Sequence, residues 1–120
     1  MSEALRAYKA ELFKALGHPA RIRILEILRG GETSVSELQT ALGVEAPVVS
    51  QQLAVLRARR LVESRKAGSS VYYRVRDPRV WQILDAGREL FVTQLEDLRA
   101  GLDEDDSGGD FAALRAGAAR

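Results

Sequence analysis

Cysteine and histidine, on which much metal, redox and nucleophilic chemistry depends, are nearly absent from this 120-residue sequence. It contains no cysteine and one histidine, His18, so disulfides, thiolate metal ligands and cysteine nucleophiles are excluded. His18 lies between Gly17 and Pro19, where a capping or surface role explains it better than metal ligation by a lone imidazole. No phosphate-binding glycine loop is present either. We predict that the protein is not an enzyme and uses no metal or cofactor.

A run of four acidic residues, 103–106, is the remaining candidate for ion binding. A calcium site needs oxygen ligands spaced along a defined loop, and this run lacks that spacing. The glycines and charges that follow are typical of a solvated segment. We therefore predict a domain over residues 1–102 and an acidic, disordered tail over residues 103–120.

Charge is unevenly distributed along the chain. Residues 1–45 carry six basic and six acidic side chains, residues 46–76 carry seven basic and one acidic, and residues 77–120 carry five basic and ten acidic. The middle segment therefore concentrates positive charge, although the net charge of the chain is only +1. A salt-bridged solvated face would explain the charge taken alone. Together with the residue types around it, the pattern indicates an anion-binding surface.

The basic segment also contains residues suited to reading DNA. A helix expected over 46–59 places Val49, Leu53 and Leu56 at core spacing, so small and polar residues occupy its other side. Short donors, acceptors and apolar groups are what read base edges in the major groove. We predict base contacts by Ala46, Pro47, Val48, Ser50, Gln51 and Ala54. We predict contacts to phosphates, and a wing that approaches the DNA backbone, from Arg57, Arg59, Arg65, Lys66, Gly68, Ser69, Ser70 and Arg74.

These residues must be positioned by a small, mainly helical fold. Apolar periodicity and glycine or proline boundaries predict helices over 3–16, 19–29, 34–43, 46–59 and 79–102. Ser34 or Ser36 is expected to cap the third of these. Strands are predicted over 61–66 and 71–75 with a hairpin loop at 67–70, while 32–35 is too short for more than a strand stub. The predicted class is mainly α with a small β-hairpin wing, a winged helix-turn-helix with about five helices.

Three motifs carry a resemblance to a known family. The sequence LGHPARIRIL at residues 16–25 resembles the second-helix signature of ArsR/SmtB-type repressors. Residues 47–56 are similar to their recognition helix, and residues 61–66 and 68–73 are similar to their wing. The motifs occur in the family's order over more than half of the chain. One departure is Glu45, which stands where the family often has a serine cap, so we expect a less firmly capped recognition helix.

The resemblance implies a homodimer formed by the first and last helices. The last helix supports this, because its apolar stripe is longer and wider than packing on a three-helix body requires. The alternative is a last helix folded back on its own monomer. Trp81 and Phe91 are interpreted as packing residues, although the dimer interface is also where an effector would fit. The predicted interface consists of Leu5, Tyr8, Leu12, Val80, Ile83, Leu84, Phe91, Leu95 and Leu98.

The familiar metal sites of this family are missing from the sequence. Many relatives bind soft metals through a Cys-x-Cys pair on the third helix, and the corresponding positions here are Ser34 and Ser36. A hydroxyl does not replace a thiolate toward soft ions. Other relatives use Asp and His on the last helix, and residues 79–102 contain no histidine. An unidentified small-molecule effector therefore stays among the candidate partners.

The combined prediction is a cytoplasmic repressor that binds double-stranded DNA as a dimer and senses no metal through Cys or His. A twofold dimer would present two recognition helices about one DNA turn apart, which implies a near-palindromic operator. No apolar run approaches the ~18 residues of a membrane span. The alternative function is a winged-helix protein-interaction module without operator binding. The inducing signal, the target genes and the choice between repression and activation stay open.

Overall fold

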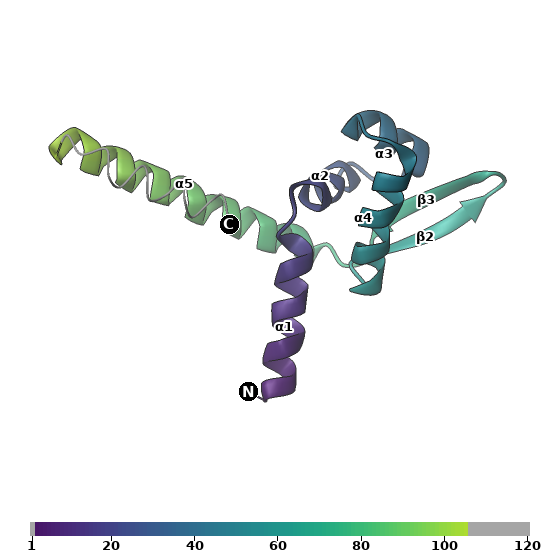
Figure 1. Ribbon diagram of the computed structural model, residues 1–120, viewed down its shortest axis with the longest axis horizontal. Helices are drawn as coiled ribbons and strands as arrows, with labels where there is room; N and C mark the ends of the chain where they lie inside the picture. Colours follow the sequence, from purple (N-terminus) through teal and green to yellow (C-terminus); the bar gives the residue numbers. More distant parts are fainter. Residues whose placement is uncertain (1, 106–120) are drawn as a thin grey trace. The chain divides into compact units, whose positions relative to one another are not determined.

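The computed structural model describes residues 2–105. The elements follow in the order α1 (Glu3–Leu16), α2 (Pro19–Leu28), β1 (Thr33–Ser34), α3 (Val35–Leu42), α4 (Ala46–Ala58), β2 (Val62–Ala67), β3 (Ser70–Val75) and α5 (Arg79–Asp105) (Figure 1). This order confirms the predicted mainly α class with a β-hairpin wing. The described chain divides into two compact units between Gln82 and Ile83, so α5 begins in the first of them. No helix within the described residues is long and apolar enough to cross a membrane.

The start of α2 is set by His18 and Pro19. The Nδ1 atom of His18 accepts a hydrogen bond from the backbone N–H of Ala20 at 3.1 Å, and Pro19 occupies the first turn. This confirms the capping role, because the bond satisfies one of the donors that every helix start leaves unpaired. In contrast, Glu45 precedes α4 without a side-chain capping bond, as its departure from serine led us to expect.

Ser34 caps α3. Its hydroxyl oxygen accepts from the backbone N–H of Glu37 at 3.1 Å, and the hydroxyl lies 3.0 Å from Glu37 Oε1 and donates to it. Of the two candidate caps, Ser34 is therefore the one that serves, and Ser36 lies inside the helix. Because both hydrogen-bonding directions of Ser34 are used locally, its presence is explained without any ligand.

The hairpin is tighter than predicted. Antiparallel pairing continues to Ala67 opposite Ser70, which leaves a two-residue turn of Gly68 and Ser69 in place of the predicted four-residue loop. Gly68 has a φ of +61°, a conformation that a glycine adopts without steric cost. Two-residue turns of this kind match the twist of the flanking strands, so pairing extends to the tip.

Helix α5 is three residues longer than predicted, because it ends at Asp105. This corrects the expectation that residues 103–105 are disordered. No glycine or proline follows Leu102 until Gly108, so nothing in the covalent chain stops the helix at Leu102. The remainder of the predicted tail, 106–120, lies outside the described residues.

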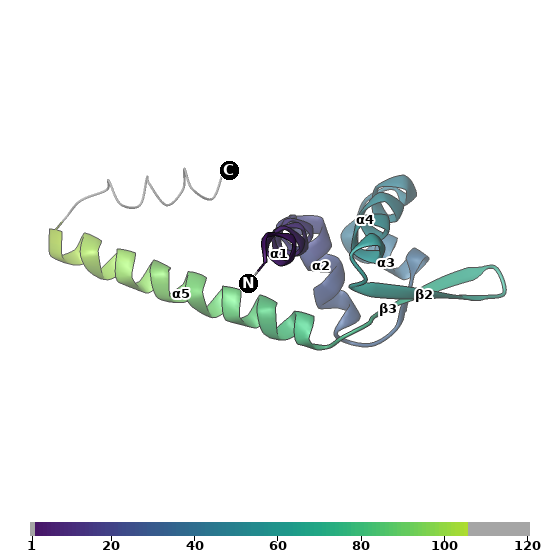
Figure 2. The same cartoon turned by 90° about the horizontal axis from the view of Figure 1, so that it is seen from below.

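The three strands form one antiparallel sheet in the order β1-β3-β2. The stub β1 pairs with the middle of β3, Thr33 opposite Tyr73, and so anchors the hairpin to the start of α3. Figures 1 and 2 both show the hairpin of β2 and β3 projecting beyond α3 and α4. The hairpin is thus held at its base and free at its tip.

The core lies among α2, α3 and α4. The side chains with less than 2% relative exposure, together with Leu28 at 2%, are those of Ile24, Leu25, Leu28, Leu38, Val49, Leu53 and Leu56. The three from α4 are the ones that its periodicity predicted. Helix α4 contacts α2, α3 and β2, so one apolar stripe fixes it against three neighbours.

The first turn of α5 also joins this core. Val80 is only 4% exposed, and the indole N–H of Trp81 donates to the backbone oxygen of Leu25 at 2.7 Å. The packing role of Trp81 is confirmed. The assignment of Val80 to a dimer interface is wrong, because the monomer already buries it. At the helix start, a hydrogen bond from the Arg79 guanidinium and a second from its backbone N–H lower the pKa of Asp77 to about 2.

Arg21 ties α1, α2 and α4 together. Its guanidinium donates to the backbone oxygens of Ala15 and Lys14 at 2.7 and 3.2 Å and to Gln52 Oε1 on α4 at 2.9 Å. The carbonyl groups at the end of a helix otherwise lack partners. One planar group therefore caps α1 and holds α4 at the same time.

Replacing Arg21 with lysine should destabilise the fold, because a lysine ammonium cannot reach all three acceptors at once. We expect the free energy of unfolding to fall by about 1–2 kcal/mol, measured by urea denaturation. Arg23→Lys is the matched control, since Arg23 is exposed and its one ion-pair partner among residues 2–105 is Glu26 at 3.4 Å. The control should change stability by less than about 0.5 kcal/mol. Equal losses of unfolding free energy in both variants would contradict the role of Arg21 in joining α1 to α4.

Candidate nucleic-acid interface

One side of α4 is free of the core. All six residues predicted to contact bases are exposed, namely Ala46, Pro47, Val48, Ser50, Gln51 and Ala54. Gln51 lies nearly opposite the buried stripe of Val49, Leu53 and Leu56, because residues in an α-helix are 100° apart. The burial of that stripe therefore turns outward a surface of short, uncharged side chains, some polar and some apolar. Such a surface is what a helix needs to approach base edges.

The hairpin has two chemically different faces. Pairing and the alternation of side chains place Lys66, Val71 and Tyr73 on one face and Arg65 and Tyr72 on the other. Tyr73 lines a pocket together with α4 residues, so its face is the one turned toward that helix. Of the wing residues predicted to contact phosphate, Lys66 shares this face. Arg65 and its neighbour Arg74 do not.

Arg65 is held by groups of the protein itself. One terminal nitrogen of its guanidinium lies 2.6 Å from Glu32 Oε1 and Nε lies 2.8 Å from the same oxygen. The guanidinium carbon also lies 4.7 Å from the centre of the Tyr72 ring, within the range of a cation–π contact. The hydrogen bond from Arg65 is the main cause that lowers the pKa of Glu32. Arg65 is thus oriented, and part of its charge is already balanced.

Two further arginines of the predicted surface face carboxylates. Arg74 lies 3.7 Å from Glu63 across the hairpin, and Arg59 lies 3.5 Å from Glu11 on α1. Arg57 and Lys66 have no acidic partner within the part of the chain that the structure describes. These two are the predicted cations most available to an external anion.

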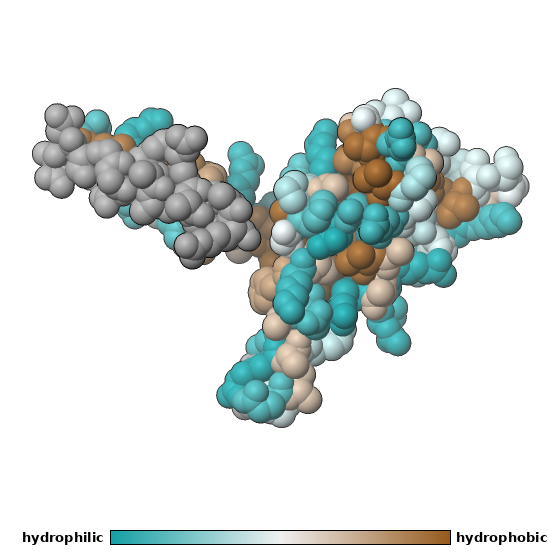
Figure 3. Space-filling view, in the orientation of Figure 1, coloured by the Kyte–Doolittle hydropathy of each residue, from teal (hydrophilic) through white to brown (hydrophobic). Residues whose placement is uncertain are grey.

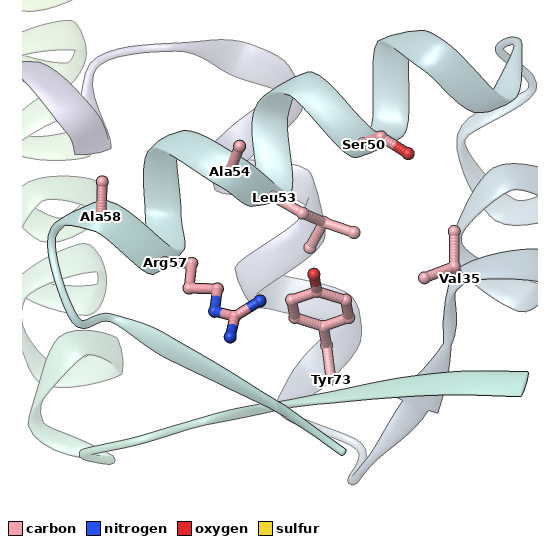
Figure 4. Close-up of a pocket in the computed structure, with 7 residues that line it drawn as sticks. All are labelled: Val35, Ser50, Leu53, Ala54, Arg57, Ala58 and Tyr73. Atoms are coloured by element: carbon pink, nitrogen blue, oxygen red, sulfur yellow. The ribbon is translucent and has the colours of Figure 1, made fainter. Parts of the chain in front are cut away.

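Between α4 and the sheet lies an open pocket of about 370 Å³ (Figure 4). Its lining residues are Val35, Ser50, Leu53, Ala54, Arg57, Ala58 and Tyr73. Ser50, Ala54 and Arg57 were predicted from the sequence to face DNA, and the structure brings them together at this pocket. Tyr73 was not predicted. Its alternation with Val71 and Val75 in the strand is the signal that could have placed it toward the helices.

The surface over α3, α4 and the hairpin is mixed in polarity. In the space-filling view, hydrophobic side chains are interspersed among hydrophilic ones over α3 and α4, and the far end of the hairpin is mostly pale or hydrophilic (Figure 3). Gly68 and Ser69 at the turn are exposed and Ser70 is half-buried. Residues of this size allow a close approach to another backbone.

Helices α1 and α5 each expose large apolar side chains. Those with at least 36% relative exposure are Leu5, Tyr8 and Phe13 on α1, and Ile83, Leu90, Phe91, Val92 and Leu95 on α5. Leu12, Leu84 and Leu98, also predicted for an interface, are partly exposed. Phe13, Leu90 and Val92 extend the predicted set.

The described residues contain no group of three or more His, Cys, Asp or Glu side chains that could hold a metal ion. The features that stand out are therefore a polar helix face, a hairpin with a basic edge and a pocket between them. None of these brings together a nucleophile and a base.

Comparisons with known proteins give the family. Residues 18–64 match the model of the family "Bacterial regulatory protein, arsR family". The chain is 44% identical over 108 residues to the HTH-type transcriptional regulator Rv0081 of Mycobacterium tuberculosis, described as uncharacterized, covering 83% of this chain and 95% of that protein. The crystal structure of Rv0081 superposes with a TM-score of 0.73 at 42% identity, over 80% of this chain and 97% of that one.

Two further relatives have informative names. The biofilm growth-associated repressor of Xylella fastidiosa is 39% identical over 85 residues, covering 71% of this chain and 75% of that protein. A homodimeric winged helix-turn-helix DNA-binding domain, Mb0332 of Mycobacterium bovis, has a TM-score of 0.67 at 31% identity, over 75% of this chain and 86% of that one. With its winged helix-turn-helix architecture, this chain belongs to the arsR family of bacterial regulatory proteins.

Proposed function

We propose that the protein is a homodimeric transcriptional repressor that binds an operator in double-stranded DNA. The observation that carries the proposal is the outward polar face of α4 beside the basic hairpin. The names of the relatives support it, since one is a repressor and another a homodimeric DNA-binding domain. The cytoplasm is the compartment in which such a protein meets its DNA.

Recognition would be divided between α4 and the cations around it. Gln51 and Ser50 offer donors and acceptors to base edges, and Pro47, Val48 and Ala54 offer apolar contact to thymine methyl groups. Arg57 and Lys66 would neutralise phosphates, which provides affinity without sequence information. Arg59, Arg65 and Arg74 would contribute less, because each already faces a carboxylate.

Dimerisation would cover the apolar side chains that α1 and α5 expose. Burial of apolar surface contributes about 25 cal/mol per Å², and a monomer seldom leaves such a stripe in water. On α5, Phe91 at 47% exposure and Leu95 would lie at the centre of a twofold contact.

Residue spacing on α5 supports this face. Leu84, Phe91, Leu95 and Leu98 share one side of the helix, since their positions repeat every three or four residues. A twofold axis places the same surface of both copies in contact and separates the two α4 helices by about one DNA turn. The operator would accordingly be near-palindromic.

The signal that releases the repressor would not be a metal bound by thiol or imidazole groups. The chain has no cysteine, and its one histidine already uses Nδ1 to cap α2. We propose regulation by an unidentified small molecule, for which the covered dimer face offers apolar surface.

The first test separates sequence reading from phosphate binding. Selection from genomic fragments should yield a near-palindrome, and affinity for it should fall steeply with salt, as counterion release requires. Gln51→Ala should reduce discrimination between operator and unrelated duplex by about 1–3 kcal/mol. Lys66→Ala should weaken both duplexes alike and lower the salt slope by about 1. Salt-independent binding, or none, would favour the protein-interaction module.

The second test concerns the dimer. Phe91→Glu should convert the protein to a monomer in sedimentation and weaken operator binding, because a charge in an apolar contact is costly. Thr93→Glu is the matched control, since Thr93 is exposed on the opposite side of the same helix and should leave the dimer intact. A monomeric parent protein would instead support a last helix that folds back on its own chain.

The third test concerns Arg65, whose charge is partly balanced by Glu32. Glu32→Gln should free Arg65 and increase affinity for any duplex, by about threefold to tenfold at low salt, with a steeper salt dependence. Glu26→Gln makes the same change of charge at the exposed pair with Arg23 on α2 and should have a smaller effect. If both variants gained equally, net charge and not Arg65 would be responsible.

A further inference from the structure

The pocket between α4 and β3 brings together polar groups that the fold itself does not use. Arg57 has no acidic partner, and the side-chain hydroxyls of Ser50 and Tyr73 form no hydrogen bond within the described residues. Figure 4 shows Arg57 extending from α4 toward Tyr73, whose hydroxyl points from the sheet toward the helix. Leu53, at 1% exposure, closes the base of the pocket. The Arg57 guanidinium and the Tyr73 hydroxyl thus face each other beside an apolar base, and the Ser50 hydroxyl lies farther along the lining (Figure 4).

We propose that this pocket binds one phosphate of the DNA backbone together with the sugars on either side of it. The proposal rests on the proposed function and adds to it a specific phosphate site shared by helix and wing. It assigns a ligand role to Tyr73, which no sequence motif indicated.

The arrangement of α4 and the hairpin places a DNA strand at this pocket. A helix fills the major groove, which is about 12 Å wide. The hairpin lies beside α4 and projects beyond it (Figures 1 and 2), so with α4 in the groove the hairpin lies past the groove's edge. The strand that borders the groove must then cross between the two elements. The pocket lies between the same two elements.

The lining suits this occupant. Arg57 would supply a charge-assisted hydrogen bond to a non-bridging oxygen, and the hydroxyl of Tyr73 would donate to the same phosphate. Val35 and Ala58 lie at opposite ends of the lining (Figure 4), so they offer apolar contact to the sugars on either side of the phosphate. The pocket volume of about 370 Å³ exceeds what a phosphate alone needs. Apolar side chains line part of the remaining space.

The neighbouring cations argue that Arg57 is reserved for an external anion. Arg59 on the same helix and Arg65 on the hairpin each lie within 3.5 Å of a carboxylate, whereas Arg57 faces none within the described residues. The hydroxyl of Tyr73, which has no hydrogen-bond partner within the described residues, is available to donate to the same anion.

A phosphate held from both sides would fix how deeply α4 enters the groove. Arg57 lies on the helix and Tyr73 on the sheet, so a single anion would join two elements. Contacts of this kind set register and orientation and carry no base information. The site would therefore act equally on the operator and on unrelated duplex.

The test compares Tyr73→Phe and Arg57→Gln with the parent protein on operator and unrelated duplex over a series of salt concentrations. Tyr73→Phe should weaken both duplexes by the same factor, about threefold to tenfold, with an unchanged salt slope, because the lost donor is neutral. Arg57→Gln should weaken both by about tenfold and reduce the slope by about 1. Thermal unfolding of each variant checks that the fold is retained.

Tyr72→Phe is the matched control. Tyr72 is adjacent but lies on the opposite face of the hairpin, where its ring contacts Arg65, so the loss of its hydroxyl should not change affinity. Single methylphosphonates along the operator locate the phosphate: one substitution should weaken the parent protein and have little further effect on the double variant of Tyr73→Phe and Arg57→Gln.

Three results would overturn the proposal: parent-like binding by Tyr73→Phe, an equal loss in Tyr72→Phe, or a loss confined to the operator. A failure of the parent protein to bind any duplex would instead reject the proposed function, and with it the phosphate site. The two failures are distinguishable because the first leaves the salt-dependent binding of the parent intact.

Discussion

The burial of Val49, Leu53 and Leu56 determines how α4 is rotated about its own axis. Each of these side chains is at most 1% exposed, and a rotation of one residue, 100°, would expose at least one of them at a cost of about 2 kcal/mol. The direction in which Gln51 and Ser50 point is therefore a consequence of core packing. The candidate reading surface needs no contact of its own to hold it in place.

The tilt of α4 and its position relative to the hairpin depend on hydrogen bonds at its edges. Arg21 connects Gln52 to the last carbonyls of α1, and the pairing of β1 with β3 holds the hairpin against α3. A displacement of the end of α1 would therefore strain the bond to α4. In a dimer built on α1 and α5, this bond gives the interface a short physical route to the reading face. The route is a set of contacts, and coupling along it is a hypothesis that requires a measured change in affinity.

Local signals made much of this fold predictable. Pro19 after a capping histidine, Gly43 with a φ of +67° after α3, and the i, i+4, i+7 spacing on α4 each act within one or two turns of chain. What the sequence could not supply were contacts across long separations. The carboxylates facing Arg59 and Arg65 lie 48 and 33 residues away, and spacing carries no record of such pairs. The burial of Val80 and the orientation of Tyr73 are likewise properties of the assembled core and sheet.

Those long-range ion pairs change how the basic segment, residues 46–76, is expected to interact with DNA. Its concentration of cations suggests strong attraction to any polyanion, yet Arg59, Arg65 and Arg74 face Glu11, Glu32 and Glu63. A phosphate that engages one of these arginines must displace a carboxylate, so little is gained where the fit is poor. Phosphates that reach Arg57 and Lys66 gain more binding free energy, because these two cations have no carboxylate to give up. Base contacts on a matching sequence add to that gain. Internal carboxylates would therefore lower non-specific affinity more than operator affinity, and the modest net charge of the chain would favour discrimination over DNA binding as such.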